Sequence, residues 1–209
     1  LAVRIVAFFN LKVRLMWQGE RETYAKIKSG LTGGDRVVWV HAASLGEFEQ
    51  GRPLMERMRR LHPEYKILLT FFSPSGYEVR KNYTGADVIC YLPMDTPGNV
   101  ASFFRLVKPE MAFFIKYEFW LNMLAELRRR NIRTYIASAI FRPNSIFFHP
   151  IGGIWRDALR SFDTLFVQDE RSKALLAEIG VENVVVAGDT RFDRVIAIAD
   201  EAERVDVVE

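Results

Sequence analysis

The sequence predicts an α/β protein built on a doubly wound parallel sheet with helices on both faces. Two observations support this fold class. Short apolar segments rich in β-branched residues alternate along the chain with longer segments whose apolar residues recur at helical spacing. The short segments are apolar throughout, which is typical of strands buried on both faces of a parallel sheet. No fixed-period repeat, low-complexity tract or internal linker interrupts this order, so we predict one main domain.

An N-terminal helix and a glycine-rich loop at residues 31–35 precede the alternating elements. The predicted strands are short runs of mainly apolar residues: Val37–His41, Lys66–Phe71, Asp87–Leu92, Met111–Ile115, Thr134–Ser138, Thr164–Val167 and Val184–Ala187. The predicted helices are the stretches between them: Glu47–Leu61, Gly76–Tyr83, Gly98–Val107, Glu118–Arg130, Gly152–Ser161 and Glu170–Ile179. Candidate helix caps precede some of them, such as Asp95 or Thr96 before Pro97.

The first 18 residues form an amphipathic pattern. An apolar stripe lies opposite a polar one at helical spacing: Ile5, Phe9, Val13 and Met16 against Arg4, Arg14 and Gln18. A second apolar stripe of Phe8, Leu11 and Leu15 exceeds what one packing surface requires. The pattern fits a helix lying in a membrane interface, whereas a spanning helix needs about 20 apolar residues. A docking helix or partner interface fits equally well. We treat residues 1–20 as a separate helical unit.

Composition excludes several classes of protein. The chain is 49% hydrophobic and 26% charged, which indicates a globular protein. Its 29 basic and 26 acidic residues give a net charge of +3, too small an excess to indicate a nucleic-acid partner. Cys90 is the only cysteine, so a disulfide framework within the chain is excluded. The three histidines, His41, His62 and His149, lack metal-ligand spacing, and we expect no metal site.

The turn after the first predicted strand carries the best candidate for a chemical group, Glu47. In a parallel α/β sheet this turn lies at the carboxyl end of the strand, where such folds bind ligands. Ser44 and Glu47 also match a capping box, which needs no active site, and spacing alone leaves both interpretations open. Gly46 is not needed for capping and costs roughly 1 kcal/mol relative to alanine, but it would let a substrate approach the backbone.

Other strand ends offer further candidates. Ser73, Ser75 and Gly76 fit either an anion or sugar cradle or a simple helix cap. Glu118 follows the fourth strand at a predicted helix start, and two carboxylates at one cleft suit acid/base work on sugar hydroxyls, although two capped helices would look the same.

The loop after the fifth strand is unusually apolar. Its residues 145–149 either pack on their own domain or meet lipid or a partner, and Arg142 before them either meets an anionic group or is an ordinary surface residue.

Six blocks of the sequence together resemble one known family. They are His41–Glu47, Thr70–Gly76, Leu92–Asp95, Tyr117–Asn122, Ser138–Arg142 and Gly188–Asp193. In order and spacing they resemble the transferases of 3-deoxy-D-manno-octulosonic acid (Kdo). The resemblance implies a two-domain GT-B glycosyltransferase that moves Kdo from CMP-Kdo onto a lipid A precursor, lipid IVA, in lipopolysaccharide biosynthesis. It implies action at the cytoplasmic face of the bacterial inner membrane, on the membrane surface and without a cofactor.

The chain resembles the N-terminal half of such an enzyme. Residues 21–195 would form its Rossmann-like acceptor-binding domain. Residues 196–209 would begin a linker to a C-terminal donor-binding domain absent from this chain. The first residue is leucine and the chain stops in a charged stretch, so we expect a part of a longer protein that is inactive alone.

The resemblance also implies roles for individual residues. Glu47 matches the proposed catalytic base, and Glu118 matches the second glutamate of the family's E-T-E-x-W-P-N block. The first glutamate of that block is Lys116 here and its proline is Leu121, so the role of the first acid is absent. We expect acceptor contacts from Ser44, Gly46, Ser73, Ser75, Gly76, Glu118 and Arg142, and donor-side or domain-junction contacts from Gly188, Asp189 and Arg191. Asp189 replaces the family's usual asparagine.

Three alternatives stay open at this point. One is another GT-B transferase of lipid-linked sugars, and a second is a noncatalytic, membrane-associated Rossmann-like binding module. A nucleotide-dependent oxidoreductase comes third, because neither G-x-G-x-x-G nor G-x-x-x-x-G-K-[ST] occurs in the chain.

Overall fold

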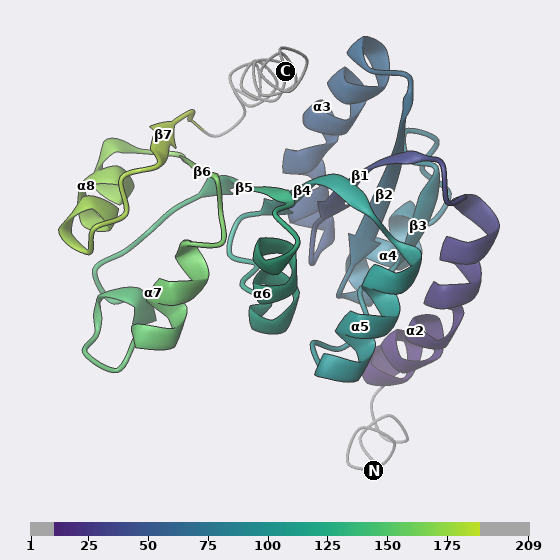
Figure 1. The fold of residues 1–209 in the computed structure, drawn as a ribbon, viewed down its shortest axis with the longest axis horizontal. Coiled ribbons are helices and arrows are strands. Elements are labelled where there is room, and N and C mark those ends of the chain that lie inside the picture. Colours follow the sequence, from purple (N-terminus) through teal and green to yellow (C-terminus); the bar gives the residue numbers. More distant parts are fainter. Residues whose placement is uncertain (1–10, 189–209) are drawn as a thin grey trace.

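A single seven-stranded sheet organises the protein. The computed structural model describes residues 11–188 of the chain. Figure 1 shows the strands from β7 at the left to β3 at the right, in the order β3-β2-β1-β4-β5-β6-β7. Each strand lies parallel to its neighbours. The strands are β1 (Arg36–His41), β2 (Tyr65–Phe71), β3 (Val88–Tyr91), β4 (Pro109–Ile115), β5 (Arg133–Ala139), β6 (Thr164–Val167) and β7 (Val184–Val186). All seven overlap predicted strands, so the doubly wound parallel sheet is confirmed.

Helices cover both faces of this sheet. They are α2 (Leu11–Gly30), α3 (Leu45–Leu61), α4 (Pro74–Arg80), α5 (Pro97–Leu106), α6 (Leu121–Arg129), α7 (Gly153–Leu159) and α8 (Glu170–Glu178). Successive side chains of a strand point to opposite faces, and β1 therefore contributes to two cores. Val37 and Trp39 pack with residues of α2, α5, α6 and α7, whereas Val38 and Val40 pack with residues of α3 and α4. This two-sided burial explains why the strands are apolar throughout.

The helix α2 runs unbroken past residue 20, the boundary expected from the sequence. Its second half lies along β3, where Thr23 Oγ1 donates to the Tyr91 carbonyl at 2.8 Å and Ile27 enters the core. Tyr91 ends β3, so this part of α2 reaches the carboxyl edge of the sheet. Of the predicted amphipathic segment, residues 1–10 lie outside the described residues. Within residues 11–188 no helix combines the length and apolarity needed to cross a membrane.

Three helix starts differ from the sequence prediction by two residues or more. The helix α3 begins at Leu45, two residues before the predicted start at Glu47. The helix α4 begins at Pro74, two residues early, because Ser73 Oγ accepts a hydrogen bond from the Ser75 N–H at 3.3 Å and caps it. It also ends early, at Arg80 and not at Tyr83.

The predicted helix start at Glu118 is wrong, because α6 begins at Leu121. The Asp95 carboxylate accepts the backbone N–H groups of Asn122 and Met123 at 2.9 and 3.0 Å, which satisfies donors of the first turn from a distant loop. Glu118 therefore lies in the loop between β4 and α6.

The apolar loop after β5 packs on its own domain, which decides between the two interpretations left open above. It forms a short 3₁₀ helix, η1 (Ile146–Phe148). Phe147 is buried, with ring contacts to Phe119 and Phe141 at 4.8 and 5.4 Å between centroids. The exposed apolar side chains of this region come later, at Ile151 and Ile154.

Candidate active site

The two candidate carboxylates follow neighbouring strands. The strands β1 and β4 are adjacent, and the chain runs from β1 outward to β2 and β3 on one side and from β4 to β7 on the other. Open α/β sheets bind ligands at this reversal of strand order, beyond the carboxyl ends of the strands. Glu47 lies in the first turn of α3, directly after β1, and Glu118 lies in the loop after β4. Two segments 71 positions apart in the sequence therefore meet at one edge of the sheet, near enough for the charge of Glu118 to act on Glu47.

Glu47 completes a capping box in this structure. Its Oε2 accepts a hydrogen bond from the Ser44 N–H at 3.1 Å. Burial and the nearby negative charge of Glu118 raise its pKa above the usual value, although the backbone N–H groups of Ala43 and Ser44 and the neighbouring His41 oppose the shift. The capping role is thus present, and it coexists with a carboxyl group whose proton affinity is increased.

Glu118 has the opposite electrostatic balance. Its side chain is only 15% exposed, and this burial by itself raises its pKa. Hydrogen bonds from His41 Nε2 at 3.1 Å and Trp120 Nε1 at 2.7 Å outweigh the burial, so the pKa lies below the usual value. Environments that push two neighbouring carboxyl groups in opposite directions are typical of sites that assign them different roles. Here Glu118 keeps its charge, and Glu47 is the better proton acceptor.

His41 is the site residue that sequence reasoning missed. The sequence placed it in the block His41–Glu47 but indicated no chemical role for it, yet the structure places it, fully buried, in contact with Glu118. The available signal was its position, because His41 is a polar residue that ends an apolar buried strand just before the Glu47 turn.

Residues with an unusual backbone conformation also lie at this edge of the sheet. The backbone φ is positive at two residues here. It is 66° at Lys116, directly after β4, and 58° at Ser138, near the end of β5. Side chains other than glycine rarely occupy this region, and such residues cluster at functional sites. The turn at Lys116 leads directly into the loop that carries Glu118.

Ser73 and Ser75 lie beside the Glu47 turn. The Ser73 N–H donates to the Ala43 carbonyl at 2.7 Å, and the two serine hydroxyls lie 2.9 Å apart at the surface. Gly76 differs, because it is buried and a Cβ there would lie 2.4 Å from the Phe71 ring and 3.0 Å from the Ser44 carbonyl carbon. Gly76 thus allows α4 to pack closely, and the hydroxyls are the groups available to a ligand.

Gly46 has no such packing reason. It is exposed, and a Cβ built on it would meet nothing within 4 Å. The space above the first turn of α3, next to Glu47 and Ser44, is therefore open to a ligand.

The remaining predicted residues lie farther out on the same edge. Arg142 is exposed after β5. Hydrogen bonds from Ser172 hold the pKa of the Asp169 carboxyl below its usual value, with a smaller contribution from the charge of Arg142, and the same charge opposes the rise that burial causes in the pKa of Tyr117. Gly188 adopts a φ of 73° shortly after β7. Asp189 and Arg191 lie outside the described residues.

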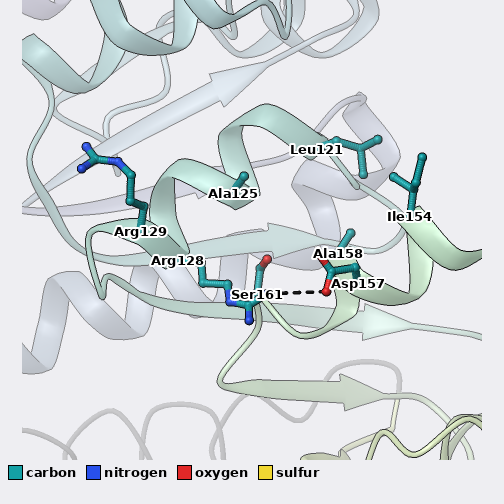
Figure 2. Close-up of a pocket in the computed structure, with 8 residues that line it drawn as sticks. All are labelled: Leu121, Ala125, Arg128, Arg129, Ile154, Asp157, Ala158 and Ser161. Atoms are coloured by element: carbon teal, nitrogen blue, oxygen red, sulfur yellow. Dashed lines mark ion pairs between the residues drawn. The ribbon is translucent and has the colours of Figure 1, made fainter.

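A groove lies away from these residues, between α6 and α7. Figure 2 shows this groove of about 540 Å³, with Arg128 and Asp157 paired at 3.7 Å across it. Its lining residues are Leu121, Ala125, Arg128, Arg129, Ile154, Asp157, Ala158 and Ser161. None of the predicted site residues is among them. Over residues 11–188 no group of three or more His, Cys, Asp or Glu side chains has the arrangement of a metal site.

Comparison with known proteins identifies the family. The sequence model described as 3-deoxy-D-manno-octulosonic-acid transferase (kdotransferase) matches residues 14–194. The chain belongs to the Kdo transferase family. Its relatives include proteins named 3-deoxy-D-manno-octulosonic acid transferase from Haemophilus influenzae, 30% identical over 75% of this chain, and Bordetella pertussis, 28% identical over 84%. The corresponding protein of Aquifex aeolicus is 36% identical over 46% of this chain.

The chain spans less than half the length of these Kdo transferases, covering 38%, 44% and 27% of the three relatives respectively. Solved structures confirm the fold of the part that is present. UDP-GlcNAc 2-epimerase from Neisseria meningitidis matches with a TM-score of 0.54 and 16% identity, over 82% of this chain and 51% of that chain. The epimerase from Methanocaldococcus jannaschii matches with the same TM-score and identity over 76% and 46%. At this identity the likeness concerns the fold alone.

Proposed function

We propose that the complete protein transfers Kdo from CMP-Kdo to a lipid A precursor, lipid IVA, in lipopolysaccharide biosynthesis. This chain is proposed to be the N-terminal, acceptor-binding half of a GT-B enzyme, with the donor bound mainly by a C-terminal half. The observation that supports the proposal is the family match together with Glu47 and Glu118 at the strand-order reversal.

The proposed reaction uses Glu47 as general base. The carboxylate takes the proton of an acceptor sugar hydroxyl while the hydroxyl oxygen forms a bond to the anomeric carbon of Kdo. The bond from that carbon to the phosphate oxygen of CMP breaks, and CMP leaves with the electron pair. General-base assistance of this kind typically contributes about 10²–10⁴-fold, and a raised pKa makes a carboxylate a stronger base at neutral pH. Burial raises the pKa of Glu47, and the negative charge of Glu118 adds to the shift.

A panel of donors tests this function. The complete protein, incubated with lipid IVA, is expected to transfer sugar from CMP-Kdo and from none of a set of UDP-sugars. Transfer from a UDP-sugar alone would indicate another lipid-linked sugar transferase. Binding of lipid IVA without any transfer would indicate a noncatalytic module.

The open space above Gly46 gives the first prediction. In Gly46→Ala the new methyl group clashes with nothing in the protein, and alanine favours the helix by about 0.5–1 kcal/mol. We expect a slightly higher melting temperature together with a KM for the acceptor raised about tenfold, because the methyl group fills space that the acceptor occupies. Gly98, which also has nothing within 4 Å, provides the matched control: Gly98→Ala should leave KM unchanged. An unchanged KM in Gly46→Ala would remove Gly46 from the acceptor site.

We also propose that the protein binds the cytoplasmic surface of the inner membrane peripherally. Ile151 and Ile154 have exposed fractions of 83% and 71%, and Ile154 lines the groove that Arg128 and Arg129 flank. Exposed apolar side chains beside cationic ones suit an anionic lipid surface. Ile151 lies in the segment between β5 and α7, and Ile154 lies in the first turn of α7. This segment leaves the sheet after β5, at the same edge as the loop of Glu118.

Removing these two side chains is predicted to weaken membrane binding. The double variant Ile151→Ser/Ile154→Ser should sediment several-fold less with vesicles of anionic phospholipid and keep the melting temperature, since the side chains make little contact with the core. Val79→Ser is the control, because Val79 is 56% exposed on α4, a different helix. Equal sedimentation of wild type and double variant would place membrane contact elsewhere.

A further inference from the structure

A chain of hydrogen bonds connects the core of the protein to Glu118. The Trp39 indole Nε1 donates to Thr70 Oγ1 at 2.8 Å, and Thr70 Oγ1 lies 2.9 Å from His41 Nδ1. His41 Nε2 then lies 3.1 Å from Glu118 Oε2. Trp39 and His41 lie on β1, and His41 is the register partner of Thr70 on β2. The pairing of β1 with β2 therefore sets the geometry.

The fixed donor at Trp39 limits the directions of the hydrogen bonds in this series. An indole N–H only donates, so Thr70 Oγ accepts from Trp39 and has one proton left to give. If Thr70 gives that proton to His41 Nδ1, the imidazole proton must be on Nε2, where it points at the Glu118 carboxylate. The series then runs in one direction, from Trp39 through Thr70 and His41 to Glu118. The Trp120 Nε1–H lies 3.1 Å from His41 Nε2 and 2.7 Å from Glu118 Oε2, and in this arrangement it donates to the nearer carboxylate oxygen.

The imidazole has little freedom to turn away from this arrangement. His41 is 0% exposed, and its ring contacts those of Phe114 and Trp120 at 5.8 and 5.7 Å between centroids. Trp120 itself packs on Phe72 at 4.8 Å and donates to the same Glu118 oxygen. Two donors held rigidly by aromatic neighbours converge on Glu118 Oε2.

We propose that His41 is a positioning residue, which holds the Glu118 carboxylate in place beside Glu47 through the hydrogen bonds of Trp39 and Thr70. His41 is fully buried, so it acts through Glu118 without touching the substrate. The inference rests on the proposed function for its catalytic consequence. The alternative to a positioning role is that His41 only fills space in the core.

Conservative and disruptive variants separate these two interpretations. His41→Gln keeps an N–H donor near the position of Nε2, whereas His41→Phe keeps the bulk and removes it. In the complete protein we expect His41→Phe to lower kcat about 10–100-fold, as loss of an outer hydrogen-bond partner does at other sites, with KM nearly unchanged. His41→Gln should recover most of that loss. Equal losses in the two variants would overturn the proposal.

Thr70 allows the same kind of test one hydrogen bond farther from Glu118. Thr70→Val removes the hydroxyl at nearly constant shape, whereas Thr70→Ser keeps it. Thr70→Val should lower kcat and Thr70→Ser should not. This pair keeps the test informative if His41→Phe fails to fold.

A double-mutant cycle then tests whether His41 acts through Glu118. If it does, His41→Phe should cost less than about threefold when Glu118 is already glutamine, because the group it positions has gone. A role confined to packing predicts the full loss in both backgrounds, and that result would overturn the proposal.

The tautomer of His41 provides a readout that does not depend on activity. With ¹⁵N-labelled histidine in the complete protein, the His41 signals should show a ring protonated at Nε2. They should change in Glu118→Gln and Thr70→Val, while His62 and His149 stay unchanged. A ring protonated at Nδ1 alone would overturn the inference even if Kdo is transferred. Absence of transfer by the wild type would refute the proposed function, and the tautomer would still test the position of His41.

Discussion

A Glu47→Gln variant of the complete protein is expected to lose about 10²–10⁴-fold in kcat while keeping its fold. Glutamine at this position still accepts the Ser44 N–H and completes a capping box, but it cannot take a proton. The substitution therefore separates the two roles that the sequence could not. If Glu47 were only a cap, the variant would transfer Kdo at a near-normal rate.

Stability provides the second half of this prediction. The pKa of Glu47 is raised in the folded protein, so its contribution to folding is fully present below the unfolded value, near 4.5, and is lost as pH rises through the folded value. At neutral pH the charged carboxylate is therefore a net cost, and Glu47→Gln should melt at the same temperature as wild type or higher. Thermal unfolding at pH 5 and pH 7 measures this directly.

Glu49→Gln is the matched control for Glu47. Glu49 lies on the same helix, and its contacts are ion pairs with Arg80 and Arg52 at 2.6 and 3.5 Å. Such partly exposed pairs contribute about 0–1 kcal/mol, so this variant should transfer Kdo normally. A comparable loss in both variants would mean that the effect belongs to α3 in general.

A Glu118→Gln variant should lose activity on the order of 10²-fold and change its pH dependence. The charge of Glu118 is one cause of the raised pKa of Glu47, so its removal should lower that pKa. The acidic limb of the kcat/KM profile, which reports protonation of the base in the free enzyme, should then move to lower pH. Loss of activity with an unmoved acidic limb would contradict the assignment of that limb to Glu47.

The stability of this variant should change in the direction opposite to that of Glu47→Gln. The lowered pKa of Glu118 means that its contribution is present above the usual value and is lost as pH falls through the folded value. Glu118→Gln should therefore be less stable than wild type at neutral pH, with the difference shrinking in acid. Glu126→Gln on α6 is the control, because Glu126 pairs with Arg129 and Arg130 at the surface and should not affect transfer.

The strands were predictable because burial on both faces makes them apolar throughout. Val37, Val38, Trp39 and Val40 are all in the core, so the sequence has no polar residue to obscure the segment. The start of α6 was not predictable from its own sequence. Its cap is Asp95, 27 residues earlier, and local patterns do not carry a contact between two loops.

The sequence by itself determined the order of strands and helices, the Ser44 and Glu47 capping box, and membership of the Kdo transferase family, since all three depend on neighbouring residues or on blocks in linear order. Only the tertiary structure decided that β1 lies beside β4. That pairing brings Glu118 close enough to add to the effect of burial, which raises the pKa of Glu47. It also brings buried His41 close enough to lower the pKa of Glu118, together with Trp120 of the same loop. Charge interactions and burial depend on distances in space, and for these groups the distances follow from the order of strands in the sheet.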